Sequence, residues 1–355
     1  MDAAEAFTGT KPVDPRLAFD EAALAAWMRA AVDGFEGPLD VRQFKGGQSN
    51  PTYRLQTPGR AYVLRRKPPG ILLPSAHAVD REFRVISALH PTGFPVARPH
   101  GLCLDPAVIG SAFYVMQAVD GRIFWDAELP GQAPSERAAV YEAEIATLAA
   151  LHRIDPRAVG LSDYGKPGNY FGRQVERWSR QYRASETVAI AEMDRLIAWL
   201  PDSLPSQDRV AIVHGDYRLD NMIFAPEAPH VRAVLDWELS TLGDPLADFT
   251  YFLMPWTLPD LGGGRGGLLG RDLQALGVPD LEQTVARYCA LTGREGAPAL
   301  DWYFAYNLFR IAAILQGIAG RVRDGTAVSA QAGGQGERVG LLAAAAWRFA
   351  KAAGA

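Results

Sequence analysis

The chain has 355 residues, 48% of them hydrophobic and 21% charged, which is the composition of an ordinary globular protein. Its 36 basic and 40 acidic side chains give a net charge of −4, which argues against a broad nucleic-acid-binding surface. The two cysteines, Cys103 and Cys289, lie far apart and form no CxxC pattern, so they indicate neither a disulfide scaffold nor a zinc site. The N-terminus lacks a basic and apolar leader, and no late segment is apolar enough to cross a bilayer. We therefore expect a cytoplasmic protein without a nucleic-acid or membrane partner.

The N-terminal third of the sequence alternates between helical and β-like patterns. Apolar residues at helical spacing predict a helix that starts at the capping residues Pro74 and Ser75, and a Pro-Gly pair at 58–59 predicts a hairpin. In chain order we expect an irregular lead-in over the first twenty residues, a helix at 21–32, strands at 52–56 and 61–65, a helix at 75–90 and a strand at 113–116.

The rest of the chain is mainly helical in pattern. We place a boundary near Val119, so that residues 1–119 form one lobe and residues 120–355 a second, larger lobe. In chain order the second lobe is expected to contain helices at 136–152 and 171–200, a connector at 201–207, strands at 222–225 and 231–235, and further helices from 247 onward, interrupted by a Gly-rich loop at 262–267.

The stretch from His214 to Asn221 reads HGDYRLDN. Its aspartate and asparagine have the spacing of the catalytic loop H-R-D-L-x-x-x-N, in which the aspartate orients the attacking hydroxyl and accepts its proton. Asp216 is therefore the candidate catalytic base. His214 is expected to hold the loop by hydrogen bonding rather than to transfer protons.

Two apolar runs after Asn221 predict a short antiparallel hairpin, in which the start of the first strand lies beside the end of the second. Asn221 and Asp236 should therefore converge. An amide oxygen and a carboxylate at one point suit Mg²⁺, which takes a few protein oxygens and completes its shell with water and phosphate. The alternative, that HGD or LDW alone is a chance match, loses weight when both occur in this order.

A glycine-rich segment, FKGGQSN, directly precedes the first predicted hairpin strand. Backbone amides in such a turn can fold over phosphates, although a Gly-Gly pair by itself is usually only a turn. The position in front of the hairpin favours nucleotide binding by Gly46, Gly47, Ser49 and Asn50.

Alternation along the strand at 61–65 places Arg65 opposite Tyr62 and Leu64, and the following helix offers Glu82 as an ion-pair partner. A guanidinium group at this position can clamp phosphate, with Arg66 or Lys67 sharing the task. The alternative is a surface Arg–Glu ion pair without function.

Asp244 and Asp248 follow the predicted metal ligand in GDPLAD. We interpret them as structural, either capping a helix that begins near Leu246 or bracing the loop of Asp216. Trp237 and Trp256 are expected to be core residues or pocket walls.

Over residues 41–323 the sequence resembles the aminoglycoside phosphotransferase and choline kinase superfamily, relatives of the protein kinases. The motifs that carry the match are VHGDYRLDN, VLDWE and GDPLAD. The resemblance implies an α+β, bilobal, protein-kinase-like fold, with a small antiparallel sheet lobe that includes a helix and a larger mainly helical lobe. It further implies an ATP- and Mg²⁺-dependent phosphotransferase with adenine held against Gln117 and Val119, Asp216 as base, and Asn221 and Asp236 as metal ligands.

The wording of residues 44–55, 63–84 and 239–248 is similar to the kinase-like domain of acyl-CoA dehydrogenase family members ten and eleven. That resemblance implies a hydroxyacyl-CoA or hydroxy-acid acceptor. Residues 250–330 hold seven acidic and seven basic side chains without an acidic cluster, which disfavours polycationic aminoglycosides. A kinase for an amino alcohol or a sugar and a non-catalytic nucleotide-binding pseudokinase stay open as alternatives.

Overall fold

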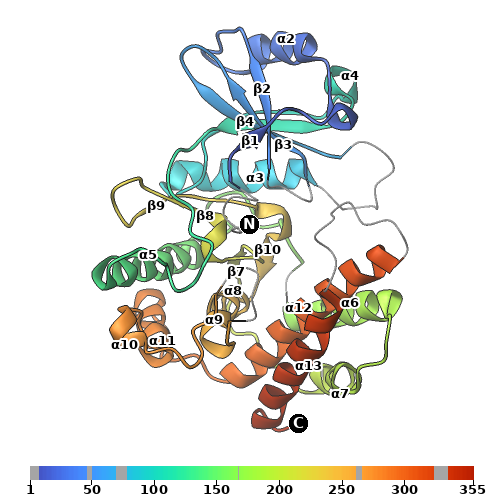
Figure 1. Ribbon diagram of the computed structural model, residues 1–355, viewed down its shortest axis with the longest axis vertical. Coiled ribbons are helices and arrows are strands. Elements are labelled where there is room, and N and C mark those ends of the chain that lie inside the picture. Colours follow the sequence, from blue (N-terminus) through green and yellow to red (C-terminus); the bar gives the residue numbers. More distant parts are fainter. Residues whose placement is uncertain (1–7, 46–49, 69–77, 167, 261–265, 324–334) are drawn as a thin grey trace.

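The N-terminal lobe is built around one antiparallel sheet of six strands (Figure 1). The computed structural model describes residues 8–45, 50–68, 78–166, 168–260, 266–323 and 335–355. The strand order is β1-β2-β3-β4-β6-β5. The strands are β1 (Thr10–Lys11), β2 (Asp40–Phe44), β3 (Thr52–Gln56), β4 (Ala61–Arg66), β5 (Pro99–Cys103) and β6 (Phe113–Gln117).

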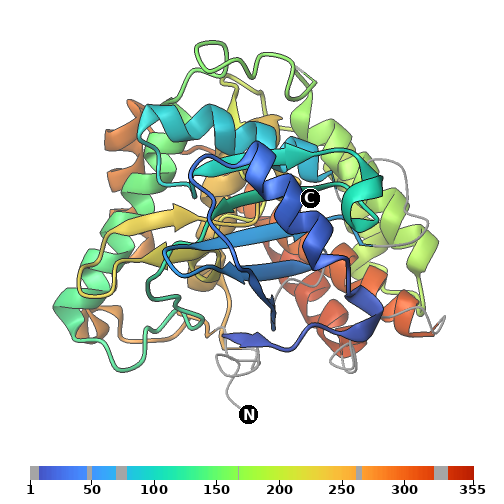
Figure 2. The same ribbon diagram turned by 90° about the horizontal axis from the view of Figure 1, so that it is seen from above.

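The two faces of this sheet carry different helices. Tyr62 and Leu64 of β4 belong to an outer core that they share with α2 (Glu21–Ala31). Figure 2, which looks down on this lobe, shows α2 lying across the strands. The opposite face carries α3 (Val79–Leu89), whose buried side chains belong to the main core of the molecule. Because side chains alternate along a strand, Arg65 lies on the α3 side, as predicted.

Helices make up most of the C-terminal lobe (Figure 1). The N-terminal lobe also contains α4 (Pro106–Ile109). The described helices of the C-terminal lobe are α5 (Pro134–Arg153), α6 (Tyr170–Ser185), α7 (Ala191–Trp199), α8 (Pro245–Phe252), α9 (Met254–Thr257), α10 (Leu273–Leu276), α11 (Leu281–Thr292), α12 (Leu300–Arg323) and α13 (Gln335–Ala352). Short 3₁₀ turns occur at Pro15–Leu17, His90–Thr92, Leu200–Asp202, Leu219–Asn221 and Trp237–Leu239.

Two small antiparallel pairs of strands sit among these helices. One pair joins β7 (Ala211–Val213) to β10 (Thr241–Gly243), and the other joins β8 (Met222–Phe224) to β9 (Val231–Val234). The β8–β9 pair is the hairpin that the sequence predicts. The β7–β10 pair was not predicted, because three-residue strands carry too little alternation to be recognised from one sequence. Together these strands frame the segment of Asp216.

Two predicted helix boundaries are wrong. The helix expected at 75–90 begins at Val79, with Ala78 before it, and the predicted caps Pro74 and Ser75 lie outside the described residues. The helix expected at 171–200 is broken, since α6 ends at Ser185 and α7 begins at Ala191. The intervening residues include Thr187 and Val188, whose β-branched side chains lower helix propensity.

The predicted irregular lead-in is also partly wrong. Thr10 and Lys11 pair with Phe44 and Gln43, which adds β1 to the edge of the sheet. Strands β2 and β5 were not predicted either. The two predicted strands at 52–56 and 61–65 and the strand at 113–116 are confirmed with small shifts of their ends.

The main core continues from one lobe into the other. Phe94, which follows α3, and Trp237 of the C-terminal lobe are both buried in it, and their rings meet edge to face with centroids 6.0 Å apart. Trp256 is buried in the same core, as predicted. Within the described part of the chain, every helix is too short or too polar to traverse a bilayer.

Candidate active site

The segment of Asp216 connects β7 to β8, and its backbone is held from α8. The carboxylate of Asp248 accepts hydrogen bonds from the backbone N–H groups of His214, at 2.5 Å, and of Gly215, at 2.8 Å. Gly215 has a φ of +87°, and a Cβ atom there would lie 2.7 Å from the carbonyl oxygen of Leu239. Only glycine fits this turn without strain. Of the two structural roles considered for Asp244 and Asp248, Asp248 takes that of bracing the loop.

Both ring nitrogens of His214 serve the same loop. Nε2 lies 2.7 Å from the carbonyl oxygen of Leu235, and Nδ1 accepts a hydrogen bond from the Asp216 backbone N–H at 3.2 Å. An imidazole that accepts at Nδ1 and donates at Nε2 is neutral. His214 is completely buried, so its contacts agree with the predicted structural task and leave no nitrogen for proton transfer.

The carboxylate of Asp216 is fixed by three donors. The Tyr251 hydroxyl donates to Oδ1 at 2.7 Å, while Asn221 Nδ2 and Arg218 Nε approach Oδ2 at 3.0 and 3.2 Å. Burial by itself would raise the pKa of Asp216, but the Arg218 charge and the Tyr251 hydrogen bond outweigh burial and lower that pKa below its ordinary value. Asp216 is thus held as an oriented anion, the form that a general base needs.

The β8–β9 hairpin brings the two predicted metal ligands to neighbouring strand ends. Met222 pairs with Val234, and the Leu235 N–H donates to the Asn221 carbonyl oxygen at 2.8 Å. The strand ends that carry Asn221 and Asp236 are therefore neighbours, as predicted, and the metal-binding role of the two residues stays a prediction. Asp236 has a φ of +62°, a conformation that costs a non-glycine residue about 1 kcal/mol or more and that concentrates at functional sites.

Arg65 reaches this point from the N-terminal lobe. Its Nε lies 2.8 Å from Glu82 Oε2, and its Nη2 lies 2.6 Å from Asp236 Oδ1 and 3.3 Å from Glu238 Oε2. The Arg65 side chain is 10% exposed and that of Glu82 is 1% exposed, so the alternative of a surface ion pair is wrong. Burial alone would lower the pKa of Arg65, but the carboxylates of Asp236 and Glu82 hold it well above its usual range.

The expected helpers of Arg65 differ in position. Arg66 is buried on the other face of the sheet, where its guanidinium lies over the Phe19 ring, 5.4 Å from the centroid. Its predicted share in phosphate binding is therefore wrong, because adjacent strand residues point to opposite faces. Lys67 follows the strand and lies 3.9 Å from Asp80.

The predicted nucleotide contacts are described only in part. Gly46, Gly47 and Ser49 lie outside the described residues. Asn50 is completely buried, and its Nδ2 donates to Glu82 Oε1 at 2.8 Å, so its side chain supports the Arg65 partner. Gln117 is the last residue of β6. Its exposed side chain lies at the start of the segment that connects the sheet to the C-terminal lobe.

Gln117 also donates its backbone N–H to the carbonyl oxygen of Arg98, and the following Ala118 donates to Ala61. Val119 comes next in the connecting segment and is half-buried. The adenine contacts assigned to Gln117 and Val119 stay predictions.

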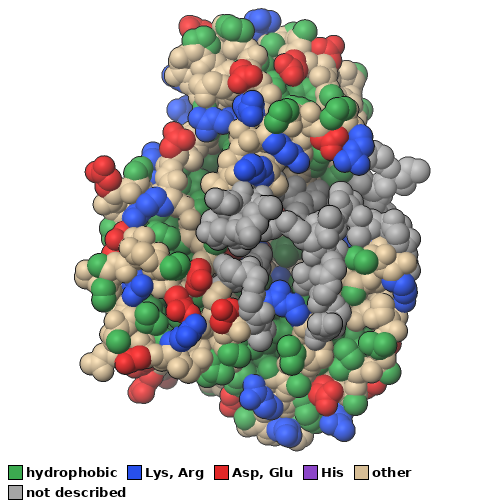
Figure 3. Space-filling model, viewed as in Figure 1, with side chains coloured by type: hydrophobic (Ala, Val, Ile, Leu, Met, Phe, Trp, Pro, Cys, Tyr) green, Lys and Arg blue, Asp and Glu red, His purple; other side chains and the backbone are tan. Residues whose placement is uncertain are grey.

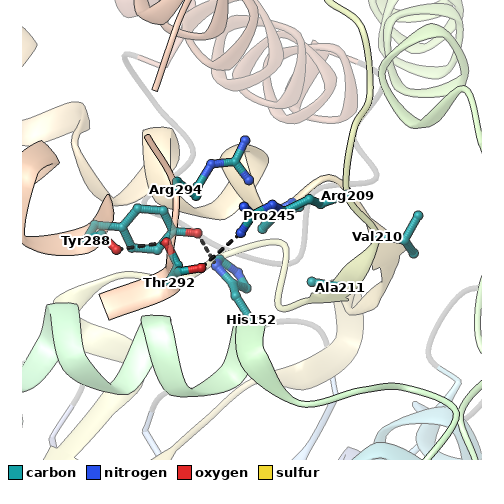
Figure 4. A pocket seen from close by; sticks show the side chains of 8 residues that line it. All are labelled: His152, Arg209, Val210, Ala211, Pro245, Tyr288, Thr292 and Arg294. Atoms are coloured by element: carbon teal, nitrogen blue, oxygen red, sulfur yellow. Dashed lines mark hydrogen bonds between the residues drawn. The ribbon is translucent and has the colours of Figure 1, made fainter. Parts of the chain in front are cut away.

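A cavity lies in the C-terminal lobe between side chains of α5, β7 and α11 and the first residue of α8 (Figure 4). Its volume is about 240 Å³, and its lining includes His152 and Tyr288. His152 Nδ1 lies 2.7 Å from the Tyr288 hydroxyl, and its Nε2 lies 3.5 Å from Asp248 Oδ2. His152 therefore lies beside the carboxylate that braces the loop of Asp216. Asp244 caps α8 by accepting the Leu246 N–H at 2.9 Å, as predicted.

Four residues of the site were not predicted. Arg218 lies inside the HGDYRLDN motif, two residues after Asp216. No role was assigned to it, although this position indicates a cation beside the candidate base. Tyr251 follows Asp248 by three residues, which places both on one face of α8. Glu238 and Arg310 come from other segments, and Arg310 donates from α12 to the Gly215 carbonyl oxygen. The signal for Glu238 was its place in the VLDWE motif, two residues after Asp236, whereas one sequence offers no signal for Arg310.

Residues 40–291 match the sequence profile of the phosphotransferase enzyme family. Acyl-CoA dehydrogenase family member 10 of Mus musculus is 45% identical over 342 residues, and acyl-CoA dehydrogenase family member 11 of Gallus gallus is 45% identical over 329 residues. These alignments cover 96% and 90% of this chain. The chain spans only 32% and 42% of the length of these two relatives.

The fold is also similar to solved structures. A Ralstonia eutropha protein solved as a candidate aminoglycoside phosphotransferase has 52% identity and a TM-score of 0.86, covering 94% of this chain and 99% of the other. Aminoglycoside phosphotransferase APH(4)-Ia, solved with AMP-PNP and hygromycin B, has 15% identity and a TM-score of 0.57, covering 88% and 95%, and shows a likeness of fold alone. With its catalytic-loop motif and two-lobed architecture, this chain belongs to the phosphotransferase enzyme family.

Proposed function

We propose that this protein transfers the γ-phosphoryl group of ATP to the hydroxyl group of a small molecule and requires Mg²⁺. The observation that carries the proposal is the meeting of Asp216, Asn221 and Asp236 around one hairpin end, with Arg65 reaching Asp236 from the other lobe. Phosphoryl transfer needs a base, metal ligands and positive charge, and little covalent chemistry from the protein.

In this proposal Asp216 orients the acceptor hydroxyl and takes its proton. Tyr251, Asn221 and Arg218 hold the carboxylate in place for that step. Arg218 is 26% exposed, so its guanidinium can also face the phosphoryl group that approaches Asp216.

The metal-binding residues would be Asn221 and Asp236. Their oxygen atoms suit a hard divalent ion, and the surplus of carboxylate around Arg65 gives the same indication. Mg²⁺ bound there would neutralise the charge on the nucleotide phosphates. For the nucleotide itself we propose the phosphate-facing loop of Gly46, Gly47, Ser49 and Asn50 and the adenine-facing segment of Gln117 and Val119.

The proposed acceptor is a hydroxyacyl-CoA or a hydroxy acid. Two relatives bear the names of acyl-CoA dehydrogenase family members, which supports an acyl-CoA-type substrate. Arg218 and Arg310 both lie near Asp216. These two cations favour an acceptor that carries negative charge. The likeness to a candidate aminoglycoside phosphotransferase keeps an aminoglycoside among the compounds to be tested, together with sugars and amino alcohols.

The experiment is a Mg²⁺-dependent ATP-consumption assay across hydroxyacyl-CoAs, hydroxy acids, sugars, amino alcohols and aminoglycosides. We expect a hydroxyacyl-CoA or hydroxy acid to stimulate turnover, and Asp216→Asn to reduce kcat by roughly 10³-fold because the base is lost. Binding of Mg·ADP to the variant is the control for a folded site. The kinase proposal fails if no acceptor stimulates turnover and nucleotide binding is independent of Mg²⁺, which is the behaviour expected of a pseudokinase.

A further inference from the structure

Arg65 contacts acidic side chains of both lobes. Its side chain comes from β4, and its nitrogens contact Glu82 of α3 and two carboxylates of the C-terminal lobe, Asp236 and Glu238. The same Nη2 atom serves the two C-terminal-lobe carboxylates. The guanidinium group therefore joins the proposed metal ligand to both lobes.

The charge balance of this cluster is uneven. One guanidinium faces the carboxylates of Glu82, Asp236 and Glu238 at 2.6 to 3.3 Å. The Glu82 carboxylate also accepts hydrogen bonds from the Tyr114 hydroxyl at 3.1 Å and from Asn50 Nδ2 at 2.8 Å. The three acids of this cluster outnumber its one guanidinium, and a divalent cation would offset that excess.

A divalent cation bound at Asp236 Oδ1 would meet Arg65 at the same oxygen atom. Mg²⁺ binds carboxylate oxygens at about 2.1 Å, and Arg65 Nη2 already lies 2.6 Å from Asp236 Oδ1. The Arg65 side chain is nine-tenths buried, and in such surroundings a guanidinium and a divalent ion beside one oxygen repel each other strongly. The two cations are therefore alternatives at Asp236 Oδ1.

We propose that Arg65 competes with Mg²⁺ for Asp236, so that the ion binds only when the guanidinium group releases this carboxylate. The inference rests on the proposed function, because that proposal makes Asp236 a metal ligand. It assigns Arg65 a positioning task on the metal ligands in addition to any contact with phosphate. The Nε contact with Glu82 remains in place while Nη2 lets go of Asp236.

The arginine itself is the reason for the competition. A guanidinium fork carries donors in several fixed directions and can bridge Glu82, Asp236 and Glu238 at once. A lysine ammonium keeps the positive charge but is a single point on a flexible stem. Arg65→Lys should therefore retain a pair with Glu82 and release Asp236.

The test measures Mn²⁺ binding to the full chain without added nucleotide, by titration with detection of free Mn²⁺ by electron paramagnetic resonance. We expect Arg65→Lys to bind Mn²⁺ about tenfold more tightly than wild type, because one charge-assisted hydrogen bond no longer has to be broken. Arg84→Lys is the matched control, since Arg84 pairs with the exposed Asp163 outside this cluster, and its Mn²⁺ affinity should equal that of wild type.

Asp236→Asn separates the two proposals. If this variant loses Mn²⁺ binding while Arg65→Lys binds Mn²⁺ no more tightly than wild type, the competition is refuted and the metal site stands. If Asp236→Asn binds Mn²⁺ as wild type does, the metal lies elsewhere and both proposals fail. Absence of Mn²⁺ binding in folded wild type and folded Arg65→Lys overturns the competition as well.

A second measurement uses only the wild type, in case the arginine variant does not fold. A crystal structure with Mn²⁺ and a non-hydrolysable ATP analogue should show Arg65 Nη2 more than about 3.5 Å from Asp236 Oδ1, beyond hydrogen-bond distance. An ion bound to Asp236 with the Arg65 hydrogen bond intact would refute the proposal.

Discussion

At the residue scale, hydrogen bonds from neighbouring side chains fix the orientation of the Asp216 carboxylate. Each of its carboxylate oxygens has at least one donor, and Tyr251 is the contact on Oδ1. The hydroxyl–carboxylate distance of 2.7 Å is that of a charge-assisted hydrogen bond. Tyr251 therefore orients the base without itself standing in the HGDYRLDN motif.

Tyr251→Phe removes this hydrogen bond and keeps the ring that packs beside Arg310. We expect kcat to fall about tenfold, with the KM for ATP unchanged, because about 1.5 kcal/mol of orientation at Asp216 is lost while the nucleotide contacts remain. Steady-state kinetics with the best acceptor measures both constants. Tyr182→Phe is the control, since the buried Tyr182 hydroxyl has no hydrogen-bond partner among the described residues. Equal losses of kcat in both variants would contradict this role.

At the element scale, side chains of α8 hold the loop of Asp216 in place. Asp244 caps its first turn, and Asp248 and Tyr251 project from one face toward the loop. The helix is only eight residues long, and its caps and tertiary contacts are what stabilise it. A change at the cap should therefore be felt in the stability of the whole lobe.

Asp244 gives this cap a pH dependence. Burial raises the pKa of Asp244 to about 6, although the Leu246 N–H and the Arg294 charge oppose the shift. Because the folded-state pKa lies above the ordinary value of 3.8, the stability from this group is fully present below about pH 4 and is lost as the pH rises through about 6.

Asp244→Asn keeps an oxygen for the cap and removes the titration. We expect the difference in unfolding free energy between the variant and wild type to shift in favour of the variant by about 1–2 kcal/mol from pH 4.5 to pH 7.5. Urea denaturation at both pH values measures the difference. A pH-independent effect of Asp244→Asn would refute the shifted titration.

At the scale of the whole molecule, the two lobes are joined by more than the segment after β6. Arg81 of α3 donates to the carbonyl oxygen of Tyr164 at 2.7 Å, and its guanidinium lies over the Tyr164 ring. The Tyr164 hydroxyl donates to the Arg81 carbonyl oxygen at 3.1 Å and lies 2.7 Å from Ser240 Oγ. In the space-filling view of Figure 3, the N-terminal lobe stands above the wider C-terminal lobe.

Tyr164→Phe cuts the hydroxyl contacts and keeps the ring under Arg81. We expect about 1–2 kcal/mol less unfolding free energy and a weaker affinity for Mg·ADP, because α3 carries Glu82, the partner of Arg65. Thermal unfolding and calorimetric nucleotide titration measure the two effects. An unchanged nucleotide affinity together with the lower stability would show that the contact is structural only.

The local parts of the site could be predicted because backbone geometry fixes them. The spacing of Asp216 and Asn221, the hairpin that returns Asp236, and the face of β4 that carries Arg65 all follow from short-range rules. Helix ends and three-residue strands could not be predicted in this way, because their intrinsic propensities are weak and packing overrides them.

The sequence by itself determined the family, the two-lobed fold and the candidates for base and metal ligands, because their signals lie within a few residues of each other. Only the tertiary structure decided which side chains serve them. Tyr251 lies 35 residues from Asp216, and Arg65 lies 171 residues from Asp236. Such pairs meet because whole elements bury their apolar faces together, and no local pattern along the chain records which polar groups that burial brings into contact.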